Sequence, residues 1–234
     1  MFGSGGRLQT CIYVDAGTTH FLIDCGASAL IGMRRWGVNP TAIDTILISH
    51  LHGDHFGGLP FLILEAQLIS KRTRPLVLAG PPGLESRLRQ AMEVFFPGST
   101  QLQPRFSLEF IELPEGRPTH VGDLLAIPQA VIHASGAPAY ALRLECGPKI
   151  IGYSGDTEWT EALLPVAKGA DLFICEAYFF DKRIKYHLDY QTLLAHRAEL
   201  GCKRLIITHL SHDLLQRIDS LELEYAEDGK QLLI

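Results

Sequence analysis

The sequence predicts an α/β fold in which two mixed β-sheets pack on each other and helices cover both outer faces. Apolar runs of strand length alternate with segments of helical spacing along the whole chain. Each half of the 234 residues supplies several strands and at least two helices, and no linker, repeat array or low-complexity tract separates the halves. Because sheet-on-sheet packing with outer helices suits this set of elements, we expect one domain over residues 1–234.

The first half of the chain alternates short strands with helices. Ser28 is a candidate N-cap for a helix to about Trp36, and Asn39-Pro40 is a second helix start with proline in the first turn. The run at 45–49 is typical of a strand buried on both faces. The predicted strands are 8–14, 21–23, 45–49 and 76–78, and the predicted helices are 28–36, 59–70 and 84–96.

The second half repeats this theme with more strands. Gly147-Pro148 separates two apolar runs and predicts a hairpin. The predicted strands are 106–113, 124–132, 140–144, 149–153, 172–175 and 204–208. One helix is expected to end at about Lys168 and another to span 189–200, and a last hairpin is expected around Asp228-Gly229.

The composition excludes several classes of protein. With 47% hydrophobic and 20% charged residues, the chain is neither disordered nor fibrous. No apolar run reaches the roughly 20 residues that cross a bilayer, so we expect no membrane partner. The first residues do not resemble a signal peptide and the five cysteines form no CxxC pair, which predicts a cytoplasmic protein with reduced thiols. The net charge of −5 argues against binding nucleic acid through overall charge, but it leaves a local basic patch open.

The segment SHLHGDH, residues 49–55, carries the clearest chemistry. It crowds three imidazoles and a carboxylate at the end of a predicted buried strand, and these are ligand types suited to Zn²⁺. Because residues two apart in an extended segment point the same way, His50 and His52 can share one metal. A tight turn after them can direct Asp54 and His55 towards a second metal.

This HxHxDH motif defines the metallo-β-lactamase superfamily, which the chain resembles from Gly3 to about His212. Further residues match the family's motifs in the expected order: Asp24 the early supporting aspartate, His133 the third histidine ligand, Asp156 the bridging carboxylate and His209 the last histidine. The resemblance implies a four-layer αββα sandwich and two divalent metal ions. We expect Zn²⁺, with Mn²⁺ or Fe²⁺ as alternatives.

The resemblance also implies seven ligands. One metal would bind His50, His52, His133 and Asp156, and the other would bind Asp54, His55, Asp156 and His209. Two branches of the superfamily fit poorly. The secreted β-lactamases commonly use cysteine near position 156, and the flavodiiron proteins need glutamate at position 52.

Within the superfamily the chain most resembles the ribonuclease Z-type phosphodiesterases. The resemblance rests on residues 49–60, on Thr208–Ser211, and on Glu176-Ala177-Tyr178-Phe179 followed by His187. In those enzymes a glutamate and a histidine from this region help to protonate the leaving oxygen. The resemblance therefore implies catalytic roles for Glu176 and His187, and for Asp54 in orienting the nucleophile as well as binding metal.

The chain departs from the tRNA-processing members of that branch. Asp156 follows His133 by only 23 positions, which leaves no room for their substrate-gripping arm. The longer loop that follows the Gly3–Gly6 turn in the tRNA enzymes is also missing, because this turn leads almost directly into Arg7-Leu8-Gln9-Thr10. We therefore expect a dinuclear phosphodiesterase in which a metal-bridging hydroxide attacks a small or nucleotide phosphodiester. The alternatives are a ribonuclease Z-like tRNA 3′ endonuclease acting on RNA, a lactonase or other acyl hydrolase, and a non-catalytic metal-binding protein. A homodimer stays open.

Other polar residues have weaker interpretations. Lys182-Arg183-Ile184-Lys185 and Arg34-Arg35 could serve a phosphate, whereas Lys71-Arg72-Thr73-Arg74 is expected to be structural. His20, His120 and His196 are expected at the surface or in structural roles, and His212 is a candidate accessory group.

Overall fold

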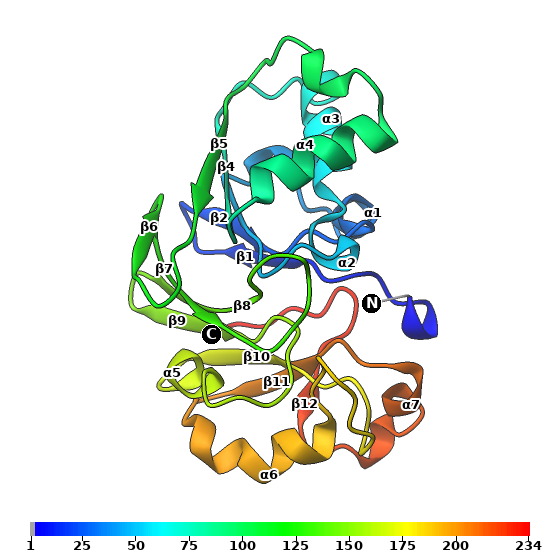
Figure 1. Ribbon diagram of the computed structural model, residues 1–234, viewed down its shortest axis with the longest axis vertical. Helices are drawn as coiled ribbons and strands as arrows, with labels where there is room; N and C mark the ends of the chain where they lie inside the picture. The colour runs from blue at the N-terminus through cyan, green and yellow to red at the C-terminus, as the bar shows by residue number, and fades with distance from the viewer. Residues whose placement is uncertain (1–2) are drawn as a thin grey trace. The chain divides into compact units, whose positions relative to one another are not determined.

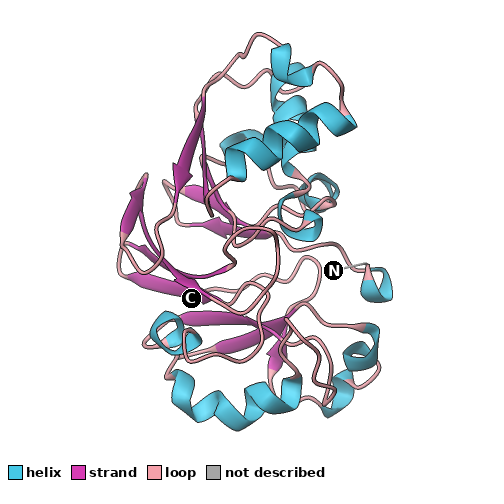
Figure 2. Ribbon diagram, in the orientation of Figure 1, coloured by secondary structure: helices cyan, strands magenta, loops and turns pink. Residues whose placement is uncertain are grey.

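The computed structural model describes residues 3–234, which form two compact units (Figure 1). The N-terminal unit is Leu8–Glu112, and the C-terminal unit is Leu113–Ile234 together with the residues up to Arg7. Each unit contains one mixed β-sheet and several helices (Figure 2). The prediction of two mixed sheets with helices is confirmed. Met1 and Phe2, which the predicted domain includes, lie outside the described residues.

The N-terminal unit is built on a five-stranded sheet in the sequential order β1-β2-β3-β4-β5. Its strands are β1 (Ile12–Asp15), β2 (His20–Ile23), β3 (Thr45–Leu47), β4 (Leu76–Gly80) and β5 (Leu108–Glu112). Only β1 is antiparallel to its neighbour, and the other pairs are parallel. The helices are α1 (Ala29–Arg35), α2 (Gly53–Phe56), α3 (Leu59–Leu68) and α4 (Leu84–Phe95), with 3₁₀ turns at Pro40–Ala42 and Ser99–Gln101.

Local sequence accounts for several of these elements. All three residues of β3 are buried, as the continuous run at 45–49 predicts for a strand between two neighbours. The side chain of Asn39 accepts a hydrogen bond from the backbone N–H of Thr41 at 3.0 Å, so it caps the proline-started turn. Ser28 precedes α1 as predicted, but its hydroxyl accepts from the backbone N–H of Gln9 at 2.7 Å rather than from the helix.

The C-terminal unit is built on a seven-stranded sheet in the order β12-β11-β10-β9-β8-β7-β6. Its strands are β6 (Thr119–Val121), β7 (Leu124–Ala130), β8 (Tyr140–Cys146), β9 (Lys149–Tyr153), β10 (Leu172–Glu176), β11 (Leu205–Thr208) and β12 (Glu224–Tyr225). Strands β6 to β9 pair antiparallel, and β9 to β12 pair parallel. The helices are α5 (Leu163–Ala167), α6 (Tyr190–Leu200) and α7 (His212–Leu215), with 3₁₀ turns at Ser4–Gly6 and Ile218–Ser220.

Turn and cap residues explain where elements of this unit begin and end. The predicted hairpin joins β8 to β9, and Gly147 at its turn has a φ of +56°, which favours glycine. Asp189 caps α6, because its Oδ1 accepts a hydrogen bond from the backbone N–H of Thr192 at 2.9 Å. The same helix ends at Gly201, whose φ is +61°.

Three features differ from the sequence-based expectations. The strand predicted at 106–113 is β5, and it pairs parallel with β4 in the first sheet instead of joining the strands that follow it. The short β6 has no apolar run and was not expected. The prediction of a C-terminal hairpin is wrong. Glu224–Tyr225 pairs parallel with β11, and residues 226–234, all of them described, contain only a turn at Asp228-Gly229.

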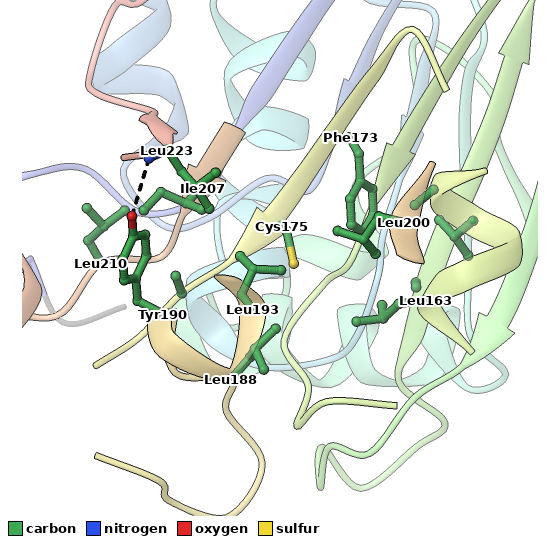
Figure 3. Packing of buried hydrophobic residues seen from close by; sticks show 14 of the residues in the cluster. Leu163, Phe173, Cys175, Leu188, Tyr190, Leu193, Leu200, Ile207, Leu210 and Leu223 are labelled. Carbon is green, nitrogen blue, oxygen red and sulfur yellow. Dashed lines mark hydrogen bonds between the residues drawn. The ribbon is translucent and has the colours of Figure 1, made fainter. Parts of the chain in front are cut away.

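The core of the C-terminal unit lies between its sheet and α6 (Figure 3). Phe173 and Cys175 from β10 and Leu193 from α6 are completely buried. The hydroxyl of Tyr190 accepts a hydrogen bond from the backbone N–H of Leu223 at 3.3 Å and so ties α6 to the chain before β12. This packing fixes the ends of β10 and β11, which carry candidate functional residues. Among the described residues, no helix is long and apolar enough to cross a membrane.

Replacing Leu193 by alanine should test this core. The side chain is fully buried, so the cavity left by Leu193→Ala should lower the free energy of unfolding by about 2–5 kcal/mol. Urea denaturation measures the change. The matched control is Gln191→Ala on an exposed position of the same helix, expected to stay within about 0.5 kcal/mol of wild type. Equal small effects of both substitutions would contradict the packing described.

Candidate metal centre

Each unit carries histidines and carboxylates at the ends of its strands. In the N-terminal unit they follow β2 and β3. In the C-terminal unit they follow β7, β9 and β11 and close β10. Because neighbouring strands hold these ends at fixed separations, each group of side chains is positioned by the sheet and does not depend on a mobile loop.

Asp24 organises the group in the N-terminal unit. It directly follows β2, is completely buried and has a φ of +58°. Its Oδ1 accepts from the backbone N–H of Ser49 at 2.8 Å, and its Oδ2 accepts from the Ser49 hydroxyl at 2.8 Å. The same Oδ2 lies 2.7 Å from Nδ1 of His55. A carboxylate on Nδ1 places the ring proton there, and Nε2 is then the nitrogen available to a metal.

The other histidines of this unit lie against His55. The ring centroids of His50 and His55 are 4.0 Å apart, and those of His50 and His52 are 5.0 Å apart. Nδ1 of His50 lies 3.1 Å from the Ser49 hydroxyl. Oδ2 of Asp54 lies 3.7 Å from Nε2 of His55. The four predicted ligands of this unit are therefore gathered in one place.

The backbone around this group is closely packed. Gly53 begins α2 and does not form the expected tight turn, so Asp54 and His55 lie in the first turn of a helix. Gly58 donates its N–H to the carbonyl of Cys25 at 2.8 Å, and a Cβ on Gly58 would lie 2.2 Å from the carbonyl oxygen of Gly26. Glycine at position 58 therefore permits the Asp24 loop and the histidine segment to approach each other.

The C-terminal unit brings two predicted histidine ligands to one carboxylate. Oδ2 of Asp156 lies 3.3 Å from Nε2 of His209 and 4.0 Å from Nε2 of His133. Asp156 and His209 are both buried. The carboxylate thus lies between the ends of β7 and β11, where it could bind a metal ion together with either imidazole.

Glu176 and His187 lie beside this carboxylate. Nδ1 of His187 is 3.0 Å from Oε2 of Glu176, and the backbone N–H of Thr157 donates to Oε1. Ligand atoms of Asp156, Glu176, His187 and His209 all lie within 4.8 Å of one another. The rings of His187 and His209 stack with centroids 5.4 Å apart. Two buried carboxylates among imidazoles form a donor set that fits a divalent cation such as Zn²⁺.

Tyr186 and Glu158 were not singled out by the sequence. Nδ1 of His133 donates to the carbonyl oxygen of Tyr186 at 2.8 Å, which leaves Nε2 of His133 directed towards Asp156. The N–H of Tyr186 donates to Oε1 of Glu158 at 2.9 Å. Tyr186 has a φ of +71°. Nothing in a tyrosine between Lys185 and His187 signals this conformation, so only the structure reveals it.

Backbone strain is concentrated at these groups. Among the described residues, four that are not glycine have a positive φ: Asp24, Lys71, Tyr186 and His209. Two of them are predicted members of the site, and Tyr186 directly precedes His187. Strain of this kind persists only where the surroundings enforce it, and it is commonly found at functional sites.

The cysteines nearby are not reactive groups. Burial, together with the charge of Asp24, raises the pKa of Cys11 to about 12. Burial, with the Glu176 carboxylate next in the chain, raises the pKa of Cys175. Since thiolates are the metal-binding and nucleophilic form, these thiols act as small apolar residues near neutral pH.

The remaining histidines have ordinary contacts. His20 lies 2.9 Å from the Tyr13 hydroxyl, and His120 is exposed. His196 stacks on Trp159 with centroids 4.0 Å apart, and His212 lies 3.0 Å from the Gln216 amide nitrogen.

The basic clusters differ in their surroundings. Arg34 pairs with Glu65. Arg72 is buried and donates to the carbonyl oxygens of Arg74 and Thr41 at 2.7 and 3.1 Å. Arg183 is exposed.

Comparison with known proteins places the chain among metallo-hydrolases. Residues 4–230 match the family described as Anti-Pycsar protein Apyc1. The chain is 28% identical to a ribonuclease Z of Methanothermobacter thermautotrophicus over 89% of this chain and 82% of that protein. It is 26% identical to a ribonuclease Z of Lachnoclostridium phytofermentans over 97% and 88% of the two proteins. The predicted relationship to ribonuclease Z is confirmed.

Solved structures confirm the fold. The metallo-β-lactamase fold protein YhfI of Bacillus subtilis aligns with a TM-score of 0.75 at 22% identity, covering 97% of this chain and 92% of that chain. The short form of human tRNase Z aligns with a TM-score of 0.77 at 23% identity and the same coverage. A diphosphatase of the PhnP family aligns with a TM-score of 0.75 at 20% identity, covering 97% and 85%. The chain has the metallo-β-lactamase fold.

The contacts of Asp24 generate a prediction about metal affinity. In Asp24→Asn the amide nitrogen cannot accept from Nδ1 of His55, so the ring loses its orienting partner. Affinity for Zn²⁺ should fall roughly 10- to 100-fold, measured by competition with a chromogenic chelator. Asp15→Asn, at an exposed carboxylate of the same unit, is the matched control and should leave the affinity unchanged. An unaltered affinity in Asp24→Asn would show that the pair does not support a metal ligand.

Proposed function

The chain belongs to the family described as Anti-Pycsar protein Apyc1. From its ribonuclease Z relatives and its candidate metal ligands, we propose that it is a metal-dependent phosphodiesterase acting on a small or nucleotide phosphodiester. The observation that carries the proposal is the Glu176–His187 pair next to Asp156. A phosphodiesterase needs both a cation to neutralise the phosphoryl oxygens and a group that protonates the leaving oxygen. The C-terminal unit carries candidates for both tasks within a few ångströms.

The proposed ligands are the seven that the superfamily resemblance implies. They are His50, His52, Asp54, His55, His133, Asp156 and His209. The donor set of each unit fits Zn²⁺, with Mn²⁺ or Fe²⁺ as alternatives. Two such ions, when bound, supply a water of lowered pKa and neutralise charge on the phosphoryl oxygens. Since the proposed ligands come from both units, we also propose that residues 1–234 act as a single domain.

The chain's own residues divide the remaining work. Asp54 orients the attacking oxygen. His187 donates a proton to the leaving oxygen from Nε2, since its Nδ1 faces the carboxylate of Glu176. The Glu176 carboxylate accepts the proton of Nδ1, so the ring donates from Nε2 when both of its nitrogens carry protons. Asp24, Ser49 and the carbonyl of Tyr186 orient histidines of the ligand set.

A ribonuclease Z-like tRNA 3′ endonuclease is the second candidate. The two curated relatives named ribonuclease Z favour it. Against it stands the short interval between His133 and Asp156, which is filled by the β8–β9 hairpin and the loops around it. A precursor tRNA assay decides between the two. Acyl hydrolysis is the third candidate, and a lactone panel tests it. A cytoplasmic location and a homodimer remain predictions.

Asp156→Ala should remove a ligand from both metal ions at once. We expect about two metal equivalents per chain in the wild type by elemental analysis, and loss of at least one in the variant. Hydrolysis of bis(p-nitrophenyl) phosphate should collapse in parallel. Asp219→Ala, at an exposed position of the same unit, should keep both metals and full activity. Two retained metals and near-normal turnover in Asp156→Ala would show that the bridge is assigned wrongly.

His187→Ala tests the phosphodiesterase proposal through the leaving group. A nucleoside alkoxide needs a proton as its bond to phosphorus breaks, whereas p-nitrophenolate leaves without one. The variant should therefore slow a dinucleotide substrate by roughly 10²–10⁴ and bis(p-nitrophenyl) phosphate far less. Metal content should be unchanged.

His120→Ala, at an exposed histidine of the same unit, serves as the control and should affect neither substrate. Equal losses on both substrates in His187→Ala would indicate a binding or structural role. No loss on either would remove His187 from the mechanism.

A further inference from the structure

A pocket of about 270 Å³ opens beside His187 within the C-terminal unit. It is formed by the loop after β9, the segment before α6 and the first two turns of α6. The residues used below are Glu158, Trp159, Arg183, His187, Asp189 and His196. The pocket begins at the proposed proton donor. A leaving group that takes its proton from His187 therefore has this space next to it.

The two acidic side chains of the pocket are engaged by the protein itself. Glu158 accepts the N–H of Tyr186 at 2.9 Å. Asp189 accepts both from the backbone N–H of Thr192 at 2.9 Å and from its hydroxyl at 2.7 Å. These contacts hold the walls of the pocket in place.

The pocket has one guanidinium side chain, that of Arg183. The Arg183 side chain is 83% exposed, and its Nε lies 3.8 Å from Oδ2 of Asp189, too far for a hydrogen bond. Its planar guanidinium carries five N–H donors that suit an oxyanion. Trp159 and His196 stack into a flat wall, and Nδ1 of His196 is held by Glu199 at 2.9 Å. The pocket thus combines a cation at its rim with a flat aromatic wall.

We propose that this pocket receives the leaving group of the substrate, and that Arg183 selects leaving groups which carry a further phosphate. The favoured substrate class is a phosphodiester of a nucleotide rather than of a plain nucleoside or alcohol. This inference rests on the proposed phosphodiesterase function. It gives a role to Arg183, which is the one basic residue of segment 182–185 that lines the pocket.

The test compares three dinucleotides: adenylyl-(3′→5′)-adenosine and its forms with an added 5′- or 3′-terminal phosphate. Product chromatography identifies which nucleoside leaves. The wild type should show a lower KM for the form whose extra phosphate lies on the leaving nucleoside. Arg183→Gln should raise that KM roughly 3- to 10-fold, as expected for an exposed charge-assisted contact, with kcat within about twofold. The KM of the other two dinucleotides should not change.

Lys185→Gln is the matched control, because it removes the same charge from the same exposed segment but not from the pocket. It should keep the wild-type preference. The proposal is overturned if the wild type shows no preference, if Arg183→Gln affects all three dinucleotides equally, or if the two substitutions have the same effect.

A binding measurement separates failure of this inference from failure of the proposed function. In a Trp36→Phe background, Trp159 is the only tryptophan of the chain and reports on the pocket. Titration of the metal-loaded protein with adenosine 5′-monophosphate should change its fluorescence at lower concentration than adenosine does. Adding Arg183→Gln should reduce that difference 3- to 10-fold. An unchanged difference overturns the pocket assignment. Absence of hydrolysis of every phosphodiester, with the fluorescence difference intact, overturns the proposed function and leaves the pocket as a nucleotide-binding site.

Discussion

A fully buried carboxylate, that of Glu176, determines how the candidate site of the C-terminal unit is arranged. A carboxylate removed from water is costly unless donors surround it, and here the donors are the N–H of Thr157 and Nδ1 of His187. The first fixes the loop that carries Asp156. The second fixes the ring that we propose as the proton donor. Because one buried carboxylate accepts from both donors, it sets the positions of Asp156 and His187 relative to each other.

The N-terminal unit uses the same device with Asp24. This carboxylate also follows a strand, is completely buried and accepts from a backbone N–H, a hydroxyl and the Nδ1 of a histidine. Each unit therefore has one buried acid that organises a strand-end loop and selects a histidine tautomer. The repeated pattern explains why a histidine-rich loop can be rigid. Nδ1 of His50 and Nδ1 of His55 each face an oxygen atom, which leaves Nε2 as the nitrogen directed at the site.

This rigid arrangement requires strained backbone conformations with positive φ at a few residues. Asp24 and His209 each turn the chain directly after a strand with a positive φ, and Tyr186 does so directly before His187. In each case the strained residue lies beside a group that the proposed mechanism uses. The Tyr186 backbone is held on both sides, by His133 and by Glu158, which is the kind of over-determination that strained conformations require.

The sequence by itself determined the fold class, most elements and the identity of the metal-binding candidates. Strand and helix signals are local, and the HxHxDH motif with its later partners is a property of residue order. The sequence-based prediction grouped β5 with the strands of the second half, and it also predicted a C-terminal hairpin. Both predictions failed because long-range packing decides which strands pair. Only the tertiary structure revealed the contact of Tyr186 with His133, the start of α2 at Gly53, and the pocket that joins Arg183 to Trp159. These depend on backbone conformation and on side chains brought together across the fold, which no local pattern of residues encodes.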